Sequence, residues 1–346
     1  MAALPVLLVV QSLALAVPLL PNEDRSTLYP ETPAQEFVNE HLGPGRMAAA
    51  GHIFYGNTPM LWRTRTFAGH TFHAPTWKDA ILAVDANAFA GNPTETLPIL
   101  AATTQVATAP ILDRLGVTWF ATPPDAPPFG IVEQHTLPSA SCDGRTSVGS
   151  EVASAPAQDS TPTTTAHVAA GETGLRGVTV RICSGGEAVP YGARLVATAH
   201  AGDHEVTGAT HLRAWLAPGD VTVGLPAEAL GGADDIEISV ELQGAPGVAL
   251  TPATTAGGDL AVDLVRPTDD GLRLAYANDL RIYERTDALP RVRWAAHSEV
   301  VSQPGDRLER LRSGHVPVDT VVLSTGDANG LDRSGRGDDS GDETAD

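Results

Sequence analysis

One short loop gathers the side chains best suited to chemistry. Residues 69–79, GHTFHAPTWKD, hold two histidines, two aromatic rings, the only lysine of the chain and an aspartate. His70, His73 and Asp79 are residue types that bind zinc. A single His-x-x-His pair without a second ligand pair does not define a metal site, so the sequence predicts no metal and no cofactor.

The same loop also has the composition of a sugar contact. Phe72 or Trp77 would supply an apolar platform, with polar side chains beside it. We therefore expect substrate binding by five residues of this loop: His70, Phe72, His73, Trp77 and Asp79. The alternative is a packed loop in which the histidines and Trp77 make local contacts only.

The motifs of common hydrolases and nucleotide-binding proteins are missing from the sequence. It contains no G-x-S-x-G, no Walker loop and no H-E-x-x-H. A carboxylate pair for glycoside hydrolysis is defined by its separation in space, so the sequence assigns no catalytic residue.

The elements that flank this loop combine helix and strand signals. Thr32, with Pro33 after it, predicts the N-cap and first turn of a helix that ends near Leu42. Further segments predict a strand at 46–50, a helix at 77–84 and a strand at 117–121. After residue 271, a hairpin (272–276 and 280–283), a strand (291–295), a helix (304–312) and a strand (318–323) are expected.

The middle of the chain has a different pattern. Apolar residues alternate with polar ones in short runs separated by Gly and Pro, and the clearest run is Ile236, Ile238, Val240 and Leu242. Such runs are typical of a β-sandwich. We therefore expect an α+β fold in which an antiparallel β-sandwich (138–268) is inserted into a split α/β domain (23–137 and 269–323).

Two cysteines, Cys142 and Cys183, lie at the start of the expected insertion. In an exported domain they would form a disulfide; in a reducing compartment they would be buried thiols.

The first 20 residues are almost wholly apolar, and no charge precedes Glu23. Their length matches a helix that crosses a bilayer. We expect a transmembrane helix over 1–22 that contacts membrane lipid, with a secretory signal peptide or a buried core helix as alternatives. A span with no flanking charge further indicates that more spans precede it, so an upstream polytopic membrane partner is expected.

The charge balance limits the partners. There are 22 basic and 42 acidic side chains, for a net charge of −20. This excess argues against nucleic acid and against a polybasic anchor on a membrane surface. The small, acidic segment 324–346 predicts a disordered tail.

Several segments in order resemble the YfhO-like family of bacterial polytopic membrane proteins, within the C-type glycosyltransferase-like superfamily. They are YPETPAQEFV (29–38), Arg46-Met47 with the 69–79 loop, APILDRLGVTWF (109–120), LRIYERTDALPR (280–291) and DRLERL (306–311) followed by 318–323. The resemblance covers about residues 1–135 and 270–323.

This resemblance implies a place in cell-envelope glycosylation from a polyprenyl-phosphate sugar donor. The family's acidic catalytic residue lies on an early loop between membrane spans, which this chain lacks, so no catalytic residue is carried over and catalysis by this chain is left open. We expect an extracytoplasmic portion of such a protein at the cell membrane, in contact with polyprenyl-linked sugar or cell-wall glycan. The alternative is a membrane-tethered glycan-binding or structural module without catalysis.

Overall fold

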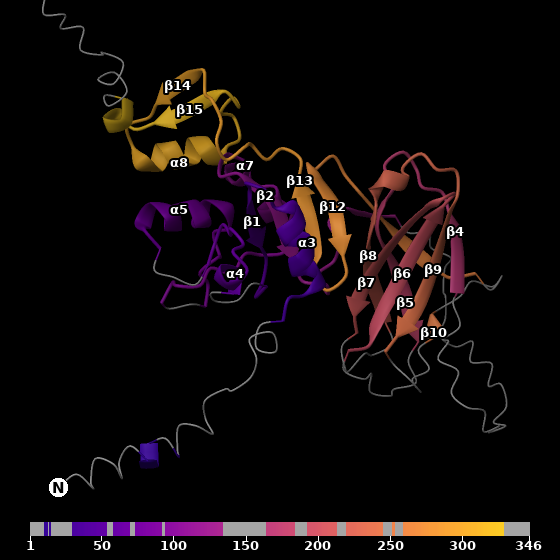
Figure 1. The fold of residues 1–346 in the computed structure, drawn as a ribbon. Coiled ribbons are helices and arrows are strands. Elements are labelled where there is room, and N and C mark those ends of the chain that lie inside the picture. The colour runs from indigo at the N-terminus through magenta and orange to yellow at the C-terminus, as the bar shows by residue number, and fades with distance from the viewer. Residues whose placement is uncertain are drawn as a thin grey trace, which may run out of the picture.

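The computed structural model describes residues 30–53, 58–69, 73–91, 94–133, 164–183, 192–212, 219–244, 251–252 and 259–328, together with 10–12 and 14. Of the described residues, 37% are in strands and 22% in helices, so the described fold is mostly β. Figure 1 shows most of the strands in two large groups, with most of the short helices beside one of them.

The first group is a mixed sheet with the strand order β1-β2-β13-β12. Its strands are β1 (Arg46–Ala49), β2 (Val117–Thr122), β13 (Arg281–Arg285) and β12 (Leu272–Ala277). Strands β1 and β2 are parallel, and the other two pairs are antiparallel. Because parallel neighbours need a crossover, the chain between β1 and β2 forms short helices: α4 (Thr58–Leu61), α5 (Pro75–Val84), α6 (Thr104–Ala107) and α7 (Pro110–Arg114).

Helix α3 (Pro33–His41) precedes the mixed sheet and begins as the sequence predicts. The Thr32 hydroxyl accepts a hydrogen bond from the Gln35 backbone N–H at 3.3 Å, with Pro33 at the first helical position. The buried apolar side chains of α3, Ala34 and Val38, pack with Met47 and Trp119 against one face of the sheet. The helices at 75–84 and 304–312, the strands around 46–50 and 117–121, and the hairpin after residue 271 are confirmed as well.

The second group is a sandwich of two antiparallel sheets, visible at the right of Figure 1. One sheet has the order β10-β5-β11-β3, with β8 on the other side of β5; the second has the order β4-β9-β6-β7. The strands of the first sheet are β3 (Ile131–Glu133), β5 (Leu175–Cys183), β8 (Gly219–Ala227), β10 (Thr251–Pro252) and β11 (Val262–Arg266). Those of the second are β4 (Thr164–Val168), β6 (Arg194–Ala201), β7 (His204–His211) and β9 (Ile236–Gln243).

Alternating side chains build the core between these two sheets. In β9, Ile236, Ile238, Val240 and Leu242 are all buried, and the residues between them are more exposed. Val178, Val180 and Ile182 of β5 meet them from the opposite sheet. One face of each strand is therefore buried, because side chains in a strand alternate between the two faces.

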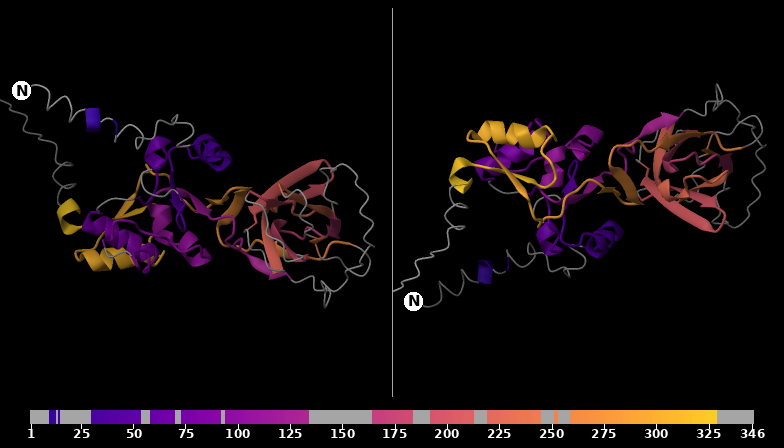
Figure 2. Two further views of the ribbon diagram at one scale, coloured as in Figure 1. Left: turned by 90° about the horizontal axis from the view of Figure 1, so that it is seen from below. Right: turned by 90° about the horizontal axis from the view of Figure 1, so that it is seen from above.

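A third, small unit completes the chain. Strands β14 (His297–Val300) and β15 (Thr320–Leu323) are parallel, and α8 (Pro304–Arg312) connects them. Leu308 and Leu311 of α8 pack against the core beneath the mixed sheet. Figure 2 shows this unit at the end of the molecule farthest from the sandwich, with β12 and β13 between the two.

Three expectations need correction. The fold is mostly β with four small sheets, not an α+β chain with a membrane anchor. Its helices are short, and three of the four strands of the mixed sheet pair antiparallel with a neighbour, so the sheet is not that of an α/β domain.

The second correction concerns the N-terminus. Over the part of the chain that the structure describes, no helix has the length and apolarity needed to cross a membrane. Of residues 1–22 only 10–12 and 14 are described, as helical and exposed, and the rest of the expected span lies outside the described residues. The expected transmembrane helix is therefore not supported.

The third correction concerns residues 291–295, which form no strand. Strand β14 begins only at His297. Val292 and Trp294 are 89% and 91% exposed, so the alternation read in the sequence does not correspond to a buried face. Of the disordered tail expected at 324–346, residues 325–328 instead form a helical turn, and 329–346 lie outside the described residues.

Candidate functional site

The loop singled out in the sequence does not form one converging site among its described residues. His70 and Phe72 lie outside the described residues. Trp77, at the start of α5, is half-buried; its ring lies 5.5 Å from that of Phe67, and the guanidinium carbon of Arg46 is 5.8 Å from its centroid. Trp77 therefore packs toward the core and does not present a free platform.

His73 and Asp79 lie elsewhere. The His73 ring is 5.8 Å from that of Phe89, and its Nε2 atom is buried without a hydrogen-bond partner. Burial lowers the pKa of His73, so the imidazole is neutral at pH 7. Asp79 is exposed on α5, beside a 240 Å³ groove that Glu309 and Arg312 of α8 also line.

No metal site is evident where the chain is described, since no three His, Cys, Asp or Glu side chains group together there. The cysteine pairing lies outside the described residues: Cys142 is not among them, and of Cys183 only the backbone at the end of β5 is described.

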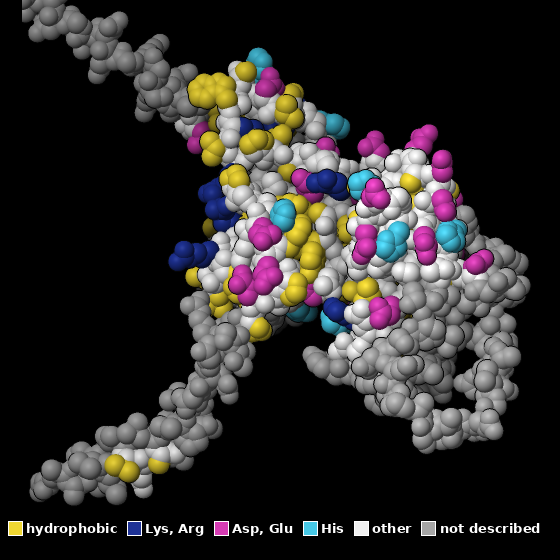
Figure 3. All heavy atoms as spheres, turned by 45° about the vertical axis from the view of Figure 1, so that its right-hand side comes forward, with side chains coloured by type: hydrophobic (Ala, Val, Ile, Leu, Met, Phe, Trp, Pro, Cys, Tyr) yellow, Lys and Arg dark blue, Asp and Glu magenta, His cyan; other side chains and the backbone are white. Residues whose placement is uncertain are grey.

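The more promising feature is a groove of about 360 Å³ between the sandwich and β12. This volume falls in the usual range of small-molecule sites. The sandwich lines the groove with Arg194, Val196, Thr207, Gly208, Ala209, Pro226 and Gln243, and the β12 side lines it with Ala275, Tyr276, Ala277 and Asn278. In Figure 3, apolar side chains run along the boundary between the sandwich and the part of the molecule built on the mixed sheet. Asp and Glu side chains are spread over the sandwich.

On the sandwich side, planar polar groups form a chain across two strands. Arg194 Nε donates to Gln243 Oε1 at 3.1 Å, and Gln243 Nε2 donates to Glu241 Oε2 at 3.1 Å. Each group is held by its neighbour, which fixes its orientation. Besides Nε–H, which donates to Gln243, the Arg194 guanidinium has further N–H donors.

On the β12 side of the groove, a hydrogen bond and a ring contact hold the Tyr276 side chain in place. Its hydroxyl donates to the carboxylate of Asp279, whose other oxygen accepts from the Ala34 backbone N–H at 3.3 Å. Its ring packs 5.1 Å from that of Phe37. Burial, and next the hydrogen bond to Asp279, raise the pKa of Tyr276, so the hydroxyl stays protonated. The groove therefore has one rigid aromatic side chain.

Gly208 lines the groove at a position where a larger side chain would not fit. A Cβ atom on Gly208 would lie 1.7 Å from the Gly224 carbonyl oxygen, far inside van der Waals contact. Strands β7 and β8 approach closely at this point because Gly208 has no side chain.

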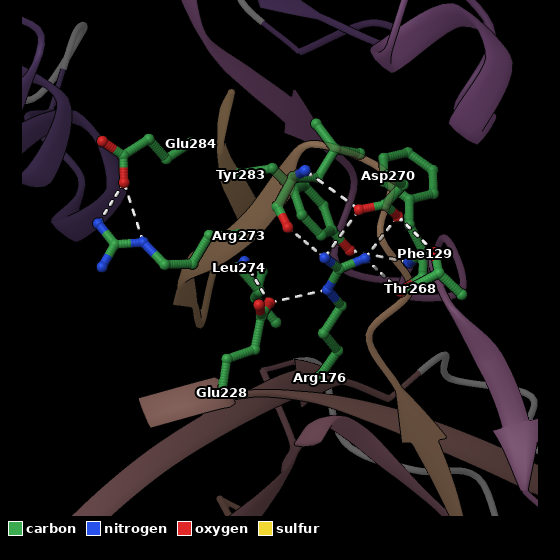
Figure 4. Close-up of polar contacts among 10 residues, drawn as sticks. Phe129, Arg176, Glu228, Thr268, Asp270, Arg273, Leu274, Tyr283 and Glu284 are labelled. Carbon is green, nitrogen blue, oxygen red and sulfur yellow. Dashed lines mark hydrogen bonds and ion pairs between the residues drawn. The ribbon is translucent and has the colours of Figure 1, made fainter. Parts of the chain in front are cut away.

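A buried ion cluster holds the sandwich against the mixed sheet. Arg176 of β5 is 1% exposed, and its Nε donates to Glu228 of the short helix η1 (Glu228–Leu230) at 2.7 Å. Its Nη1 and Nη2 donate to the two carboxylate oxygens of Asp270 at 2.6 and 2.9 Å. Glu228 also accepts from the Leu274 N–H of β12 at 2.8 Å. Figure 4 shows the guanidinium reaching from the sandwich between the two carboxylates.

The electrostatics of this cluster favour the charged forms. Burial alone would raise the pKa of Asp270, but the hydrogen bond and charge of Arg176 outweigh it and hold that pKa below its ordinary value. Burial would likewise lower the pKa of Arg176, but the hydrogen bonds to Asp270 and Glu228 leave it raised. The sandwich and the mixed sheet, which together form the groove, are thus joined by this ion cluster.

A second buried arginine lies beneath the groove. Arg281 is 1% exposed; its Nη2 donates to the Thr222 carbonyl at 2.8 Å, while Nε and Nη1 have no hydrogen-bond partner. A Cβ on Gly224 would lie 2.8 Å from that Nε atom. Burial lowers the pKa of Arg281 to about 10, so it stays charged at pH 7.

Sequence reasoning missed this groove. The strand pattern places Tyr276 in a hairpin but does not indicate that it faces a sandwich strand. Arg194 and Gln243 are 49 residues apart and belong to no motif. Only the register of β6 with β9, which pairs Arg194 with Gln243, brings them together.

Comparison with known proteins gives no further guide: no family model, curated protein or solved structure matches the chain.

Proposed function

We propose that this protein is a carbohydrate-binding module of the cell envelope, and that the groove between the sandwich and β12 holds the saccharide. The observation that carries the proposal is the pairing of a clamped Tyr276 ring with planar polar groups in one groove of about 360 Å³. The resemblance to the YfhO-like family supports a setting in envelope glycosylation, where the ligand would be a polyprenyl-linked sugar or a cell-wall glycan.

The chemistry of the groove fits a sugar. A pyranose has apolar C–H faces and a dense set of hydroxyls around its edge. A rigid aromatic ring and small apolar residues such as Ala209 and Ala277 can cover a C–H face. Arg194, Gln243 and Asn278 offer donors and acceptors in fixed planes to the hydroxyls.

The proposal assigns binding to this groove, without catalysis. The two carboxylates beside it, Glu241 and Asp279, both accept hydrogen bonds from neighbouring side chains, Gln243 and Tyr276. A carboxylate committed in this way orients its neighbour and is less available as an acid or base.

Isothermal titration of the full chain with oligosaccharides from cell-wall digests tests the proposal. Tyr276→Ala should weaken binding roughly tenfold, because it removes the aromatic contact. Tyr276→Phe keeps the ring and should retain most of the affinity, while Gln243→Ala should weaken binding by removing both the amide and the orientation of Arg194.

A matched control is Arg181→Ala on the opposite sheet of the sandwich, where an exposed arginine pairs with Asp220. It should leave affinity unchanged. Binding that is insensitive to both Tyr276→Ala and Gln243→Ala would place the sugar elsewhere, and the absence of binding to every saccharide tried would overturn the proposal.

A further inference from the structure

Two large apolar side chains project from the segment between β13 and β14. Val292 is 89% exposed and Trp294 is 91% exposed. Tryptophan is among the residues most covered in folded proteins, and here nearly all of its surface faces solvent. The two residues are separated by Arg293 and preceded by Arg291, so apolar and basic side chains alternate.

The segment lies against further arginines. A Cβ on Gly116 would come within 3.0 Å of the Arg291 Cα atom, which places the segment beside the start of β2. Burial and then the nearby charges of Arg291 and Arg65 lower the pKa of Arg46. Burial and then the charge of Arg293 lower the pKa of Arg114, so each arginine of the segment acts electrostatically on another arginine.

The hydrogen bonds described for these guanidinium groups go to backbone carbonyls. Arg46 Nη1 donates to the Leu115 carbonyl at 2.7 Å, Arg65 Nε to the Gly45 carbonyl at 3.2 Å, and Arg114 Nη1 to the Thr320 carbonyl at 2.9 Å. Asp113, next to Arg114 in the sequence, pairs with Arg285, and its charge also acts on Arg114. A chain of net charge −20 therefore carries a local cluster of positive charge, hereafter the Arg–Trp face: Arg46, Arg65, Arg114, Arg291, Val292, Arg293 and Trp294.

We propose that the Arg–Trp face docks on the surface of an anionic phospholipid bilayer, with Trp294 and Val292 in the headgroup region and the arginines on lipid phosphates. The inference is independent of the saccharide groove, which lies at the β12 edge of the mixed sheet and shares no residue with this face, whereas Arg46 belongs to β1 at the other edge.

The combination of residues favours a bilayer over other anionic partners. Guanidinium groups bind phosphate from any source, but a hydrated polyanion offers nothing apolar for Val292 and Trp294. The bilayer interface offers both, and tryptophan is enriched there because its ring is apolar with one polar edge. Because exposed charges are screened beyond a Debye length of about 8 Å, the acidic residues elsewhere in the chain do not cancel the attraction between this face and an anionic bilayer.

Quenching of tryptophan fluorescence by brominated lipid tests the proposal on the full chain. The five tryptophans include none in residues 1–22, so contact of that segment with lipid gives no signal. Vesicles of brominated phosphatidylglycerol should quench the wild type. Trp294→Phe should lose most of that quenching, and the control Trp62→Phe should retain it.

Two further variants separate the components of the face. Arg291→Ala should bind phosphatidylglycerol vesicles about fivefold more weakly, and the control Arg181→Ala should not. The double variant Val292→Ser/Trp294→Ser should weaken binding to anionic and to phosphatidylcholine vesicles alike, whereas Met60→Ser, at another exposed apolar residue, should not.

Equal quenching in wild type and Trp294→Phe, or equal binding to neutral and anionic vesicles, would overturn the proposal. So would a concentration-dependent dimer that Trp294→Phe dissociates, since a second copy would then be the occupant.

Discussion

Arg176 and Asp270 form a two-bond ion pair that connects the sandwich to the mixed sheet, with Nη1 and Nη2 at 2.6 and 2.9 Å from the two carboxylate oxygens. The residues are 94 apart in sequence, and the Arg176 side chain is 1% exposed. A pair this deeply buried holds its partners in one geometry, because leaving either charge alone would carry a large desolvation penalty.

Removing the charge of Asp270 should destabilise the protein strongly. We expect Asp270→Asn to lower the free energy of unfolding by about 3 kcal/mol, the low end for breaking a buried pair, because Glu228 still neutralises Arg176. Urea denaturation measures this. The control Asp220→Asn breaks the exposed pair with Arg181 and should cost about 1 kcal/mol or less. Equal losses in the two variants would contradict a special role for the buried pair.

The Arg176–Asp270 pair should also make the free energy of unfolding fall at acid pH. The pKa of Asp270 is below its ordinary value of 3.8 in the folded state, so the folded state holds fewer protons than the unfolded state there. The stabilisation is complete above the unfolded pKa and is lost as the pH falls from about 4 toward the lower folded pKa. Across this pH range, the free energy of unfolding should fall less steeply in Asp270→Asn than in the wild type. The same pH dependence in both proteins would exclude Asp270 as its cause.

Gly208 should not tolerate even one methyl group. Its added Cβ would lie 1.7 Å from a backbone oxygen of β8, which cannot move without displacing its strand. We expect Gly208→Ala to cost about 1–3 kcal/mol in thermal or urea unfolding. The control Gly305→Ala in α8 meets nothing within 4 Å and should be neutral or slightly stabilising.

A variant of Trp77 tests which of two candidate sites binds saccharide: the 69–79 loop predicted from the sequence, or the groove beside β12. Because its ring packs on Phe67, Trp77→Ala should lower the unfolding free energy by about 2 kcal/mol, less than for a fully buried tryptophan. Saccharide affinity measured by titration well below the melting temperature should be unchanged. A large loss of affinity with little loss of stability would return the binding site to the 69–79 loop.

Local signals in the sequence predicted individual elements well. Thr32 and Pro33 specify the start of α3 through their own hydrogen bond and backbone angle, which no distant residue needs to supply. The period-2 pattern from Ile236 to Leu242 determines which face of β9 is buried. The hairpin around residues 277–279 likewise forms between neighbours in sequence.

Elements that need a distant partner were harder to predict. The segment from Arg291 has the alternation of a strand but pairs with none, because its apolar residues have no core to enter. The apolar run at 1–20 has the composition of a membrane helix, yet no spanning helix is found within the described ranges. Composition measures the tendency of a segment to leave water, but the partners of a segment such as 291–295 depend on tertiary contacts.

What the sequence alone determined is the sum of the charges, the identity of the apolar faces and the local starts of helices and strands. What only the tertiary structure decided is which charges meet. Arg194 reaches Gln243 through strand register, Arg176 reaches Asp270 across two bodies, and Arg291 lies beside Arg46 although the chain as a whole has a charge of −20. The physical reason is that electrostatic and hydrogen-bond energies fall off with distance in space, and a sequence lists distances only along the chain.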